Sequence, residues 1–304
     1  MKKITPHLWF DKEAKESAEF YVSVFPNSKI KNHSVIKGTP SGDCDIMSFE
    51  LGGEPFMSIS AGPYFKINPS VSFMVNFDPN KDTDAKENLT KTWEKLVDGG
   101  KVMMPLQEYP FSKWYGFCED KYGVSWQLIL TNPGGEDRPF IIPSLLFVGS
   151  SYGKAEEAGD YYLTVFNQKN GQAKLGQRVK YGAGAEPNKE GTVMFSDFKL
   201  WDTWFTAMDG GGEHKFAFNE AVSFMVTCDN QEELDYFWEK LSHVPEAEQC
   251  GWCKDQFGVS WQIVPKRMNE MMASGTPEQN KRVTEAFLKM KKFDIAKLEE
   301  AYNG

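Results

Sequence analysis

The sequence lacks the features that mark a membrane-spanning or a disulfide-bonded secreted protein. No apolar run approaches the roughly 18 residues of a membrane helix, and residues 1–10 pass into a strand-like pattern without the apolar core of a signal peptide. The five cysteines, an odd number without framework spacing, predict free thiols in a reducing compartment. These absences predict a cytoplasmic protein with no membrane partner.

The chain also carries comparatively little positive charge. Lysine and arginine total 34 against 43 aspartate and glutamate residues, which gives a formal net charge of -9. Binding to phosphates requires clustered basic side chains, and neither half of the chain contains such a cluster. The charge pattern therefore argues against a nucleic-acid partner.

What the sequence does contain is an internal repeat. Three pairs of segments match in the same order, with offsets that drift between pairs: Ile-Thr-Pro-His-Leu-Trp-Phe at 4–10 with Ile-Ile-Pro-Ser-Leu-Leu-Phe at 141–147, Val-Ser-Phe-Met-Val at 71–75 and 222–226, and Gly-Val-Ser-Trp-Gln at 123–127 and 258–262. Ordered matches of this kind indicate a tandem duplication.

The repeat sets the domain boundaries. We predict a first domain over residues 1–131, a linker rich in proline, glycine and charge over 132–139, and a second domain over 140–265. Residues 266–304 predict a helical tail, in which Thr276 caps a helix before Pro277. We expect this tail to pack on a domain or on a partner subunit.

Each copy has a coarse rhythm of a short strand, an amphipathic helix and several strands, followed by the same again. In the first copy the pattern predicts a strand at 4–10, a helix at 15–25 ended by Pro26, and a second helix at 85–97. The predicted fold class is α+β, with two βαβββ modules in each copy.

These residues carry a family resemblance. The paired modules, the Asp-x-x-Gly-Val-Ser-Trp-Gln endings at 120–127 and 255–262 and the Cys-Gly-Trp-Cys run at 250–253 resemble the PhnB-like branch of the vicinal oxygen chelate superfamily, which includes glyoxalase I and bleomycin-resistance proteins. The resemblance implies that each domain curls its two modules into a half-open barrel whose cup holds a small ligand. In metal-dependent members, histidine and glutamate hold a divalent ion that acts as a Lewis acid.

Mapping that pattern onto the chain leaves a depleted ligand set. His7 falls at the usual first-ligand position and Gln127 where metal-dependent members often carry glutamate, and the second copy has Ser144 and Gln262 there. One imidazole and one amide are a poor donor set for a divalent ion. Two alternatives therefore stay open. In one, His7 and Gln127 hold a metal ion in the first domain; in the other, His7 lines the cup and the two glutamines orient a ligand or each other.

The tryptophans divide into two groups. Trp126 and Trp261 alternate with the glutamines along the last strand of each copy, so we expect them to be packing residues. The ligand-binding candidates are Trp9, Trp114 and Trp252, because an aromatic cup suits a flat or apolar ligand, although aromatic core packing is the commoner explanation.

Two further motifs favour a structural interpretation. Cys250 and Cys253 are spaced as in a redox or zinc motif, but there is no second pair and no helix start to activate a thiol. Members of this branch are often labelled demethylubiquinone methyltransferases, yet the one candidate cofactor turn, Gly182-Ala-Gly184, lies in a predicted hairpin. Methyl transfer is therefore not the expected activity.

Three functional hypotheses remain, and the sequence does not decide whether the chain is an enzyme or which residues would be catalytic. The first is a small-molecule binding protein that needs no cofactor. The second is a metal-dependent lyase, isomerase or dioxygenase that uses His7. The third is that the second copy has lost its site and pairs with the first within the chain, with a homodimer as a further alternative.

Overall fold

The computed structural model describes all residues except 1, 40, 133–136 and 169–171. The first copy contains the two predicted βαβββ modules: β1 (Ile4–Phe10), α1 (Ala14–Val24), β2 (Lys29–Thr39), β3 (Gly42–Leu51) and β4 (Glu54–Ser60), then β5 (Val71–Phe77), α2 (Ala85–Val97), β6 (Lys101–Tyr109), β7 (Ser112–Glu119) and β8 (Ser125–Leu130). The α+β prediction and the helix at 85–97 are confirmed.

The second copy repeats this order with one change. Its elements are β9 (Ile141–Phe147), α3 (Ala155–Asn167), β10 (Lys174–Lys180), β11 (Val193–Leu200) and β12 (Thr203–Asp209), then β13 (Val222–Cys228), α4 (Gln231–Leu241), β14 (Trp252–Lys254) and β15 (Ser260–Pro265). Where the first copy has β6, the second has only a 3-10 turn at Pro245–Ala247. The last module therefore has one strand fewer than predicted.

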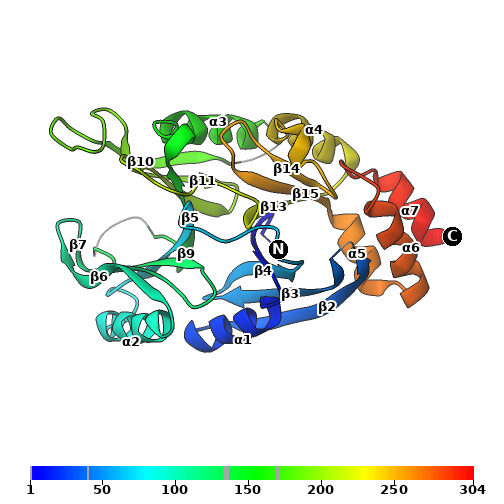
Figure 1. Cartoon of the computed structure of the whole chain (residues 1–304), viewed down its shortest axis with the longest axis horizontal. Coiled ribbons are helices and arrows are strands. Elements are labelled where there is room, and N and C mark those ends of the chain that lie inside the picture. The colour runs from blue at the N-terminus through cyan, green and yellow to red at the C-terminus, as the bar shows by residue number, and fades with distance from the viewer. Residues whose placement is uncertain (1, 40, 133–136, 169–171) are drawn as a thin grey trace.

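The strands pair between copies. One sheet, here called sheet A, has the order β14-β15-β13-β1-β4-β3-β2, and the other, sheet B, has the order β10-β11-β12-β9-β5-β8-β7-β6. In Figure 1 sheet B lies at the left and sheet A at the right, with α3 and α4 above and α1 and α2 below. Each sheet thus joins one module of each copy, and the expectation that each copy closes its own barrel is wrong.

The helix-side core, in contrast, forms within each copy. The Trp126 ring lies 5.4 Å from that of Tyr21 and 5.3 Å from that of Phe73, all in the first copy. Trp261 makes the equivalent contacts, 5.4 Å to Tyr162 and 5.6 Å to Phe224. Both tryptophans are buried, which confirms that they are packing residues. The tryptophan-centred packing forms within each copy, whereas each sheet forms between the copies. The two copies are therefore interlocked.

A buried aspartate explains the repeated ending of each copy. In the first copy, Asp120 accepts hydrogen bonds from the backbone N–H groups of Tyr122 and Val124, at 2.8 and 3.0 Å, and from the Trp126 indole, at 2.8 Å. Burial raises the pKa of Asp120 to about 6. Asp255 makes the same three bonds in the second copy. The motif therefore fixes a turn and a tryptophan in both copies.

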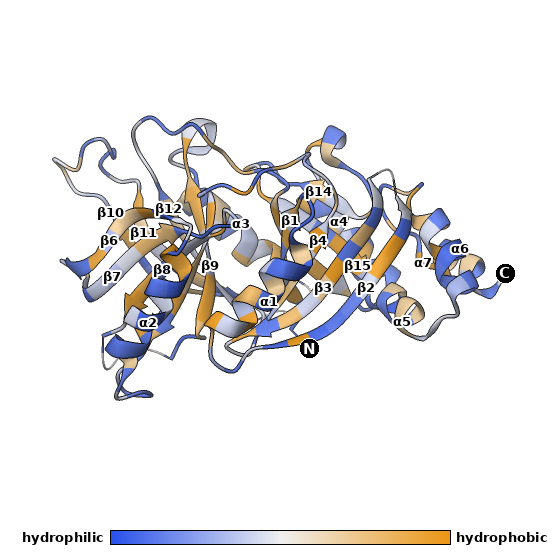
Figure 2. Cartoon of the chain, turned by 60° about the horizontal axis from the view of Figure 1, so that its bottom comes forward, coloured by the Kyte–Doolittle hydropathy of each residue, from blue (hydrophilic) through white to orange (hydrophobic). Residues whose placement is uncertain are grey.

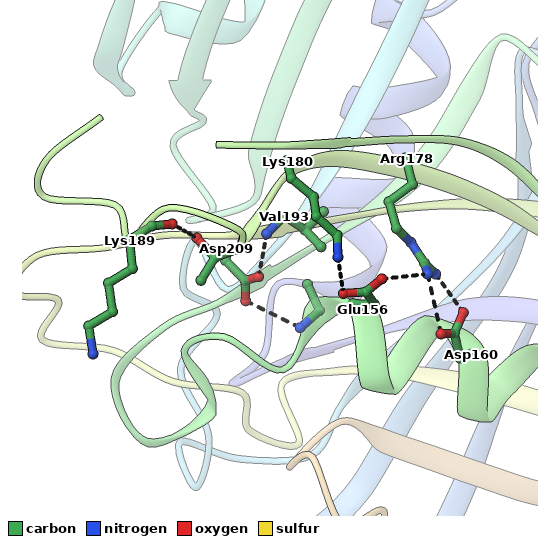
Figure 3. Close-up of polar contacts among 9 residues, drawn as sticks. Glu156, Asp160, Arg178, Lys180, Lys189, Val193 and Asp209 are labelled. Atoms are coloured by element: carbon green, nitrogen blue, oxygen red, sulfur yellow. Dashed lines mark hydrogen bonds and ion pairs between the residues drawn. The ribbon is translucent and has the colours of Figure 1, made fainter. Parts of the chain in front are cut away.

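Polar contacts also attach the outer strand β10 to its neighbouring helix, as Figure 3 shows. Arg178 pairs with Asp160 at 2.7 Å and with Glu156 at 3.2 Å. The buried Asp209, at the end of β12, accepts a hydrogen bond from the backbone N–H of Ala155, the first residue of α3, at 3.2 Å. These contacts hold α3 against sheet B.

The predicted helical tail is present as α5 (Lys266–Ser274), α6 (Pro277–Phe287) and α7 (Ile295–Asn303). Thr276 forms a capping box with Gln279 at the start of α6. The tail lies at the far end of sheet A (Figure 1) and packs on the second copy. Its backbone covers the edge beside β14, where the N–H groups of Cys250 and Gly251 donate to the carbonyls of Met290 and Lys291 at 2.8 and 2.7 Å.

Hydrophobic residues are concentrated in the strands, as β9 illustrates in Figure 2, while the outer strand β2 is largely hydrophilic. The buried side chains form one main cluster that includes residues of both copies. In the part of the chain that the structure describes, no helix combines the length and the apolar character needed to cross a bilayer.

Candidate functional site

The first candidate site is a group of side chains on sheet A, which we call the His7 face. Register places His7 of β1 opposite Ser223 of β13, and Trp252 of β14 opposite Gln262 of β15. The Trp252 ring lies 5.6 Å from that of His7 and 5.7 Å from that of Trp9. Copy one therefore supplies His7 and Trp9, and copy two supplies the other three residues.

His7 is a buried and neutral imidazole. Its side chain is only 4% exposed, and its Nδ1 is buried with no hydrogen-bond partner among the described residues. Burial lowers the pKa of His7 to about 3, because the charged form would lose its solvation. The ring is thus uncharged near neutral pH, and its buried Nδ1 has no partner within the described part of the chain.

Gln262 also has unused hydrogen-bonding capacity. The Gln262 side chain is 7% exposed, and its Nε2 donates to the Ser223 hydroxyl at 2.9 Å. Its Oε1 accepts no hydrogen bond from the described part of the chain. Ser223 is therefore the protein group that orients the Gln262 amide.

The aromatic side of the His7 face is partly exposed. Trp9 and Trp252 are both half-buried. The Trp9 indole N–H donates to the Gly62 carbonyl at 2.8 Å, and its ring packs 5.1 Å from Phe65. The loop after β4 thus fixes Trp9, while Trp252 sits at the end of a three-residue strand.

The equivalent side chains on sheet B, which we call the Gln127 face, are bonded to one another. The Gln127 Oε1 accepts from the Tyr115 hydroxyl at 2.8 Å. Its Nε2 donates to the hydroxyls of Ser72 and Ser144, at 2.9 and 3.2 Å. Beside this group, Met74, Ile142 and Trp204 form a small buried apolar cluster. The amide of Gln127 is fully used within the chain.

The structure separates several residues that the sequence placed together. His7 lies in sheet A with Gln262, whereas Gln127 lies in sheet B with Ser144. His7 and Gln127 do not share a site. This corrects the prediction that these two residues together hold a metal ion. The two glutamines do not orient each other either, since they lie in different sheets.

Trp114 is not part of either face. Its indole N–H donates to the Thr90 hydroxyl at 3.1 Å, and the Lys86 ammonium lies 4.0 Å from its ring centroid. Both partners belong to α2, so Trp114 faces the helix. Tyr115, the next residue of β7, points to the opposite side and reaches Gln127.

Sequence reasoning missed Ser223 and Tyr115. A signal for the serine was available, because the repeated Val-Ser-Phe-Met-Val motif places a serine at 72 and at 223. Both serines hydrogen-bond to the glutamine of a neighbouring strand. Tyr115 carries no such signal, because its counterpart in copy two is not a tyrosine.

The His7 face does not suit a divalent metal ion. It offers one imidazole, one hydroxyl and one amide, with no carboxylate or thiolate, whereas such ions need several anionic or imidazole ligands. Across the described residues, no group of three or more His, Cys, Asp or Glu side chains is placed to hold a metal.

The cysteines are free thiols, as predicted. Cys253 is buried in β14, and Cys250 lies in the turn before that strand. Burial raises the pKa of both thiols, so neither has the activated thiolate of a redox motif.

A cleft of about 800 Å³ lies apart from the His7 face, beside α1, α2 and the start of β9. Two of its charged residues pair with each other, since Arg138 contacts Asp197 at 2.8 Å. The Arg138 guanidinium also lies 3.7 Å from the Trp204 ring centroid. The cleft is therefore the main alternative location for a ligand.

Comparison with known proteins identifies the class. The fold is similar to that of glyoxalase I from Zea mays, which matches at a TM-score of 0.50 and 11% identity, over 85% of this chain and 92% of that one. The chain belongs to the PhnB-like family described as 3-demethylubiquinone-9 3-methyltransferase, whose model matches residues 2–129 and 139–264.

A PhnB protein from Bacillus cereus, described under the same methyltransferase name, is 35% identical to this chain. The match covers 43% of this chain and 100% of that one, with a TM-score of 0.38. Among curated proteins, none matches.

Proposed function

We propose that this chain binds a small organic molecule on the His7 face of sheet A. The observation that carries the proposal is the buried His7 Nδ1, which has no hydrogen-bond partner among the described residues, together with the Gln262 Oε1 on the same face, which accepts no hydrogen bond from those residues. Leaving a buried polar atom such as the His7 Nδ1 without a partner costs about 1–3 kcal/mol. A ligand that hydrogen-bonds to it recovers this free energy on binding.

The position and the lining of the His7 face support the same proposal. Ligand sites combine apolar and aromatic walls with a few polar groups, and here Trp9 and Trp252 stand next to His7. On sheet B the equivalent glutamine already has its partners. Of the two faces, the His7 face is therefore the one where a ligand would supply missing hydrogen-bond partners.

Methyl transfer is not part of this proposal, despite the family's name. Gly182 and Gly184 lie in the connection between the antiparallel strands β10 and β11, as the sequence predicted. A nucleotide-type cofactor turn would instead link a strand to a helix start. The metal-dependent lyase, isomerase or dioxygenase alternative requires ligands that the His7 face lacks.

The test is a thermal-shift screen of the full chain against a library of small metabolites, run on the wild type, His7→Gln and Tyr115→Phe. Ligand at 100 times its dissociation constant adds about 2.7 kcal/mol of stability, which raises the melting temperature by about 5 °C for a chain of this size. We expect the shift in the wild type and in Tyr115→Phe but not in His7→Gln. A shift that persists in His7→Gln would place the ligand elsewhere, for example in the cleft.

A parallel measurement addresses the metal. Elemental analysis of protein purified without chelators should show no stoichiometric divalent ion. A stoichiometric ion that disappears in His7→Gln would instead establish the metal-dependent alternative.

A further inference from the structure

The structure assigns a chemical class to the ligand of the His7 face: an uncharged aromatic compound with a phenol-like hydroxyl donor. This assignment rests on the proposed function, because it concerns the same site. Separate observations support the hydroxyl donor, the aromatic ring and the absence of charge on the ligand.

The donor follows from comparing the two glutamines. On sheet B the chain itself supplies a phenol, because the Tyr115 hydroxyl donates to the Gln127 Oε1 at 2.8 Å. Phe117 pairs with Gln127 as Trp252 pairs with Gln262, so the counterpart of Tyr115 is Cys250. Cys250 lies before β14 starts. The phenol that donates a hydrogen bond to the glutamine Oε1 on sheet B thus has no counterpart on sheet A.

The aromatic character of the ligand follows from the two indole side chains beside His7. The rings of Trp9 and Trp252 meet edge to face, with an interplanar angle of 76°, and both are partly exposed. An aromatic ring gains about 0.5–1.5 kcal/mol per ring contact beyond the area that it buries. A ligand ring in contact with these indoles would place its hydroxyl toward Gln262, as the ring of Tyr115 does toward Gln127.

The absence of charge follows from the surrounding strands. Besides His7 and Cys228, β1, β13 and β15 contain no ionisable side chain. Lys254 of β14 is already paired with Glu220 at 2.7 Å. A carboxylate or ammonium group on the ligand would lose its solvation here without gaining a counter-charge.

The test uses three naphthalene probes on the full chain: 2-naphthol, 2-methoxynaphthalene and 2-naphthoate. Dissociation constants come from tryptophan fluorescence, and the His7 ring C–H signal in NMR reports the location. We expect 2-naphthol to bind and shift the His7 signal, the methyl ether to bind at least about tenfold more weakly because it cannot donate, and the carboxylate not to bind.

Variants provide the matched control. Gln262→Met should remove the advantage of 2-naphthol over the ether, whereas Tyr115→Phe, at the equivalent place on sheet B, should leave it unchanged. Equal binding of the alcohol and the ether, or tighter binding of the carboxylate, would overturn the ligand class while leaving the proposed site intact. If no probe and no library compound shifts the His7 signal, the proposed function itself fails.

Discussion

Gln127 and Gln262 end the same repeated motif, yet only Gln127 has both ends of its amide hydrogen-bonded within the chain. The difference comes from the neighbouring strand. On sheet B the eight-residue β7 brings Tyr115 to Gln127, whereas on sheet A the three-residue β14 ends its pairing at Trp252. Duplication thus preserved the frame of both sheets, while Cys250 stands in the second copy where the first copy has Tyr115, so Gln262 lacks the phenol donor that Gln127 has.

The edges of the two sheets differ in the same region. On sheet B, β6 covers β7, while on sheet A the C-terminal tail covers the segment before β14. Phe293 of the tail is buried against Gly251, where an added Cβ would lie 2.5 Å from the Phe293 ring. The tail therefore supports the strand that carries Trp252.

The largest expected effect tests this support. Phe293→Ala should lower the free energy of unfolding by about 4 kcal/mol, since it removes a buried ring. Chemical denaturation measures the loss, and Phe111→Ala, at an exposed position in the turn between β6 and β7, is the control, with an expected change of about 1 kcal/mol at most. A Phe293→Ala variant as stable as the wild type would contradict a supporting role for the tail.

The shared frame predicts similar losses in both copies. Asp120→Ala and Asp255→Ala should each cost about 3 kcal/mol, because each leaves two backbone N–H groups and an indole unpaired. Denaturation curves compare the two variants. A large loss in only one of them would show that the motif does not play the same role in both copies.

Substitution of the two glutamines should lower the free energy of unfolding by different amounts on the two faces. Gln127→Met removes three hydrogen bonds and should cost about 2 kcal/mol, whereas Gln262→Met removes one and should cost about 1 kcal/mol or less. The comparison uses denaturation of the protein without added ligand. Equal costs would mean that Gln262 has a partner of its own, and the contrast between the faces would disappear.

The smallest expected effect concerns pH. Because the folded-state pKa of His7 is lowered to about 3, the unfolded chain binds a proton below pH 6.5 that the folded chain does not. Stability from this residue is therefore complete well above pH 6.5 and is lost as pH falls, by about 0.8 kcal/mol between pH 8 and pH 6. Subtracting the pH dependence of His7→Gln isolates this contribution. A difference that grows as pH rises would have the wrong sign.

Local features were predictable from the sequence. The repeat, the helix at 85–97 and the cap at Thr276 depend on neighbouring residues, and the structure confirms them. Trp126 and Trp261 were recognised as packing residues because side chains alternate along a strand.

The composition of the site was not predictable in the same way. A strand's hydrophobic pattern is the same whether its neighbour comes from its own copy or from the other, so nothing local indicated that β1 pairs with β13. That pairing places His7 beside Gln262 instead of Gln127. The unpaired Oε1 of Gln262 depends in turn on the neighbouring strand, where Cys250 stands in place of the Tyr115 of the first copy.

The most direct test of a ligand site built by both copies on the His7 face uses the four histidines of the chain as reporters. Histidine ring C–H signals, assigned with His7→Gln, are followed by NMR while the strongest binder from the metabolite screen is added to the full chain. The account predicts that the His7 signal shifts in proportion to occupancy, while those of His33, His214 and His243 stay in place. Saturable binding that leaves the His7 signal unchanged would contradict it.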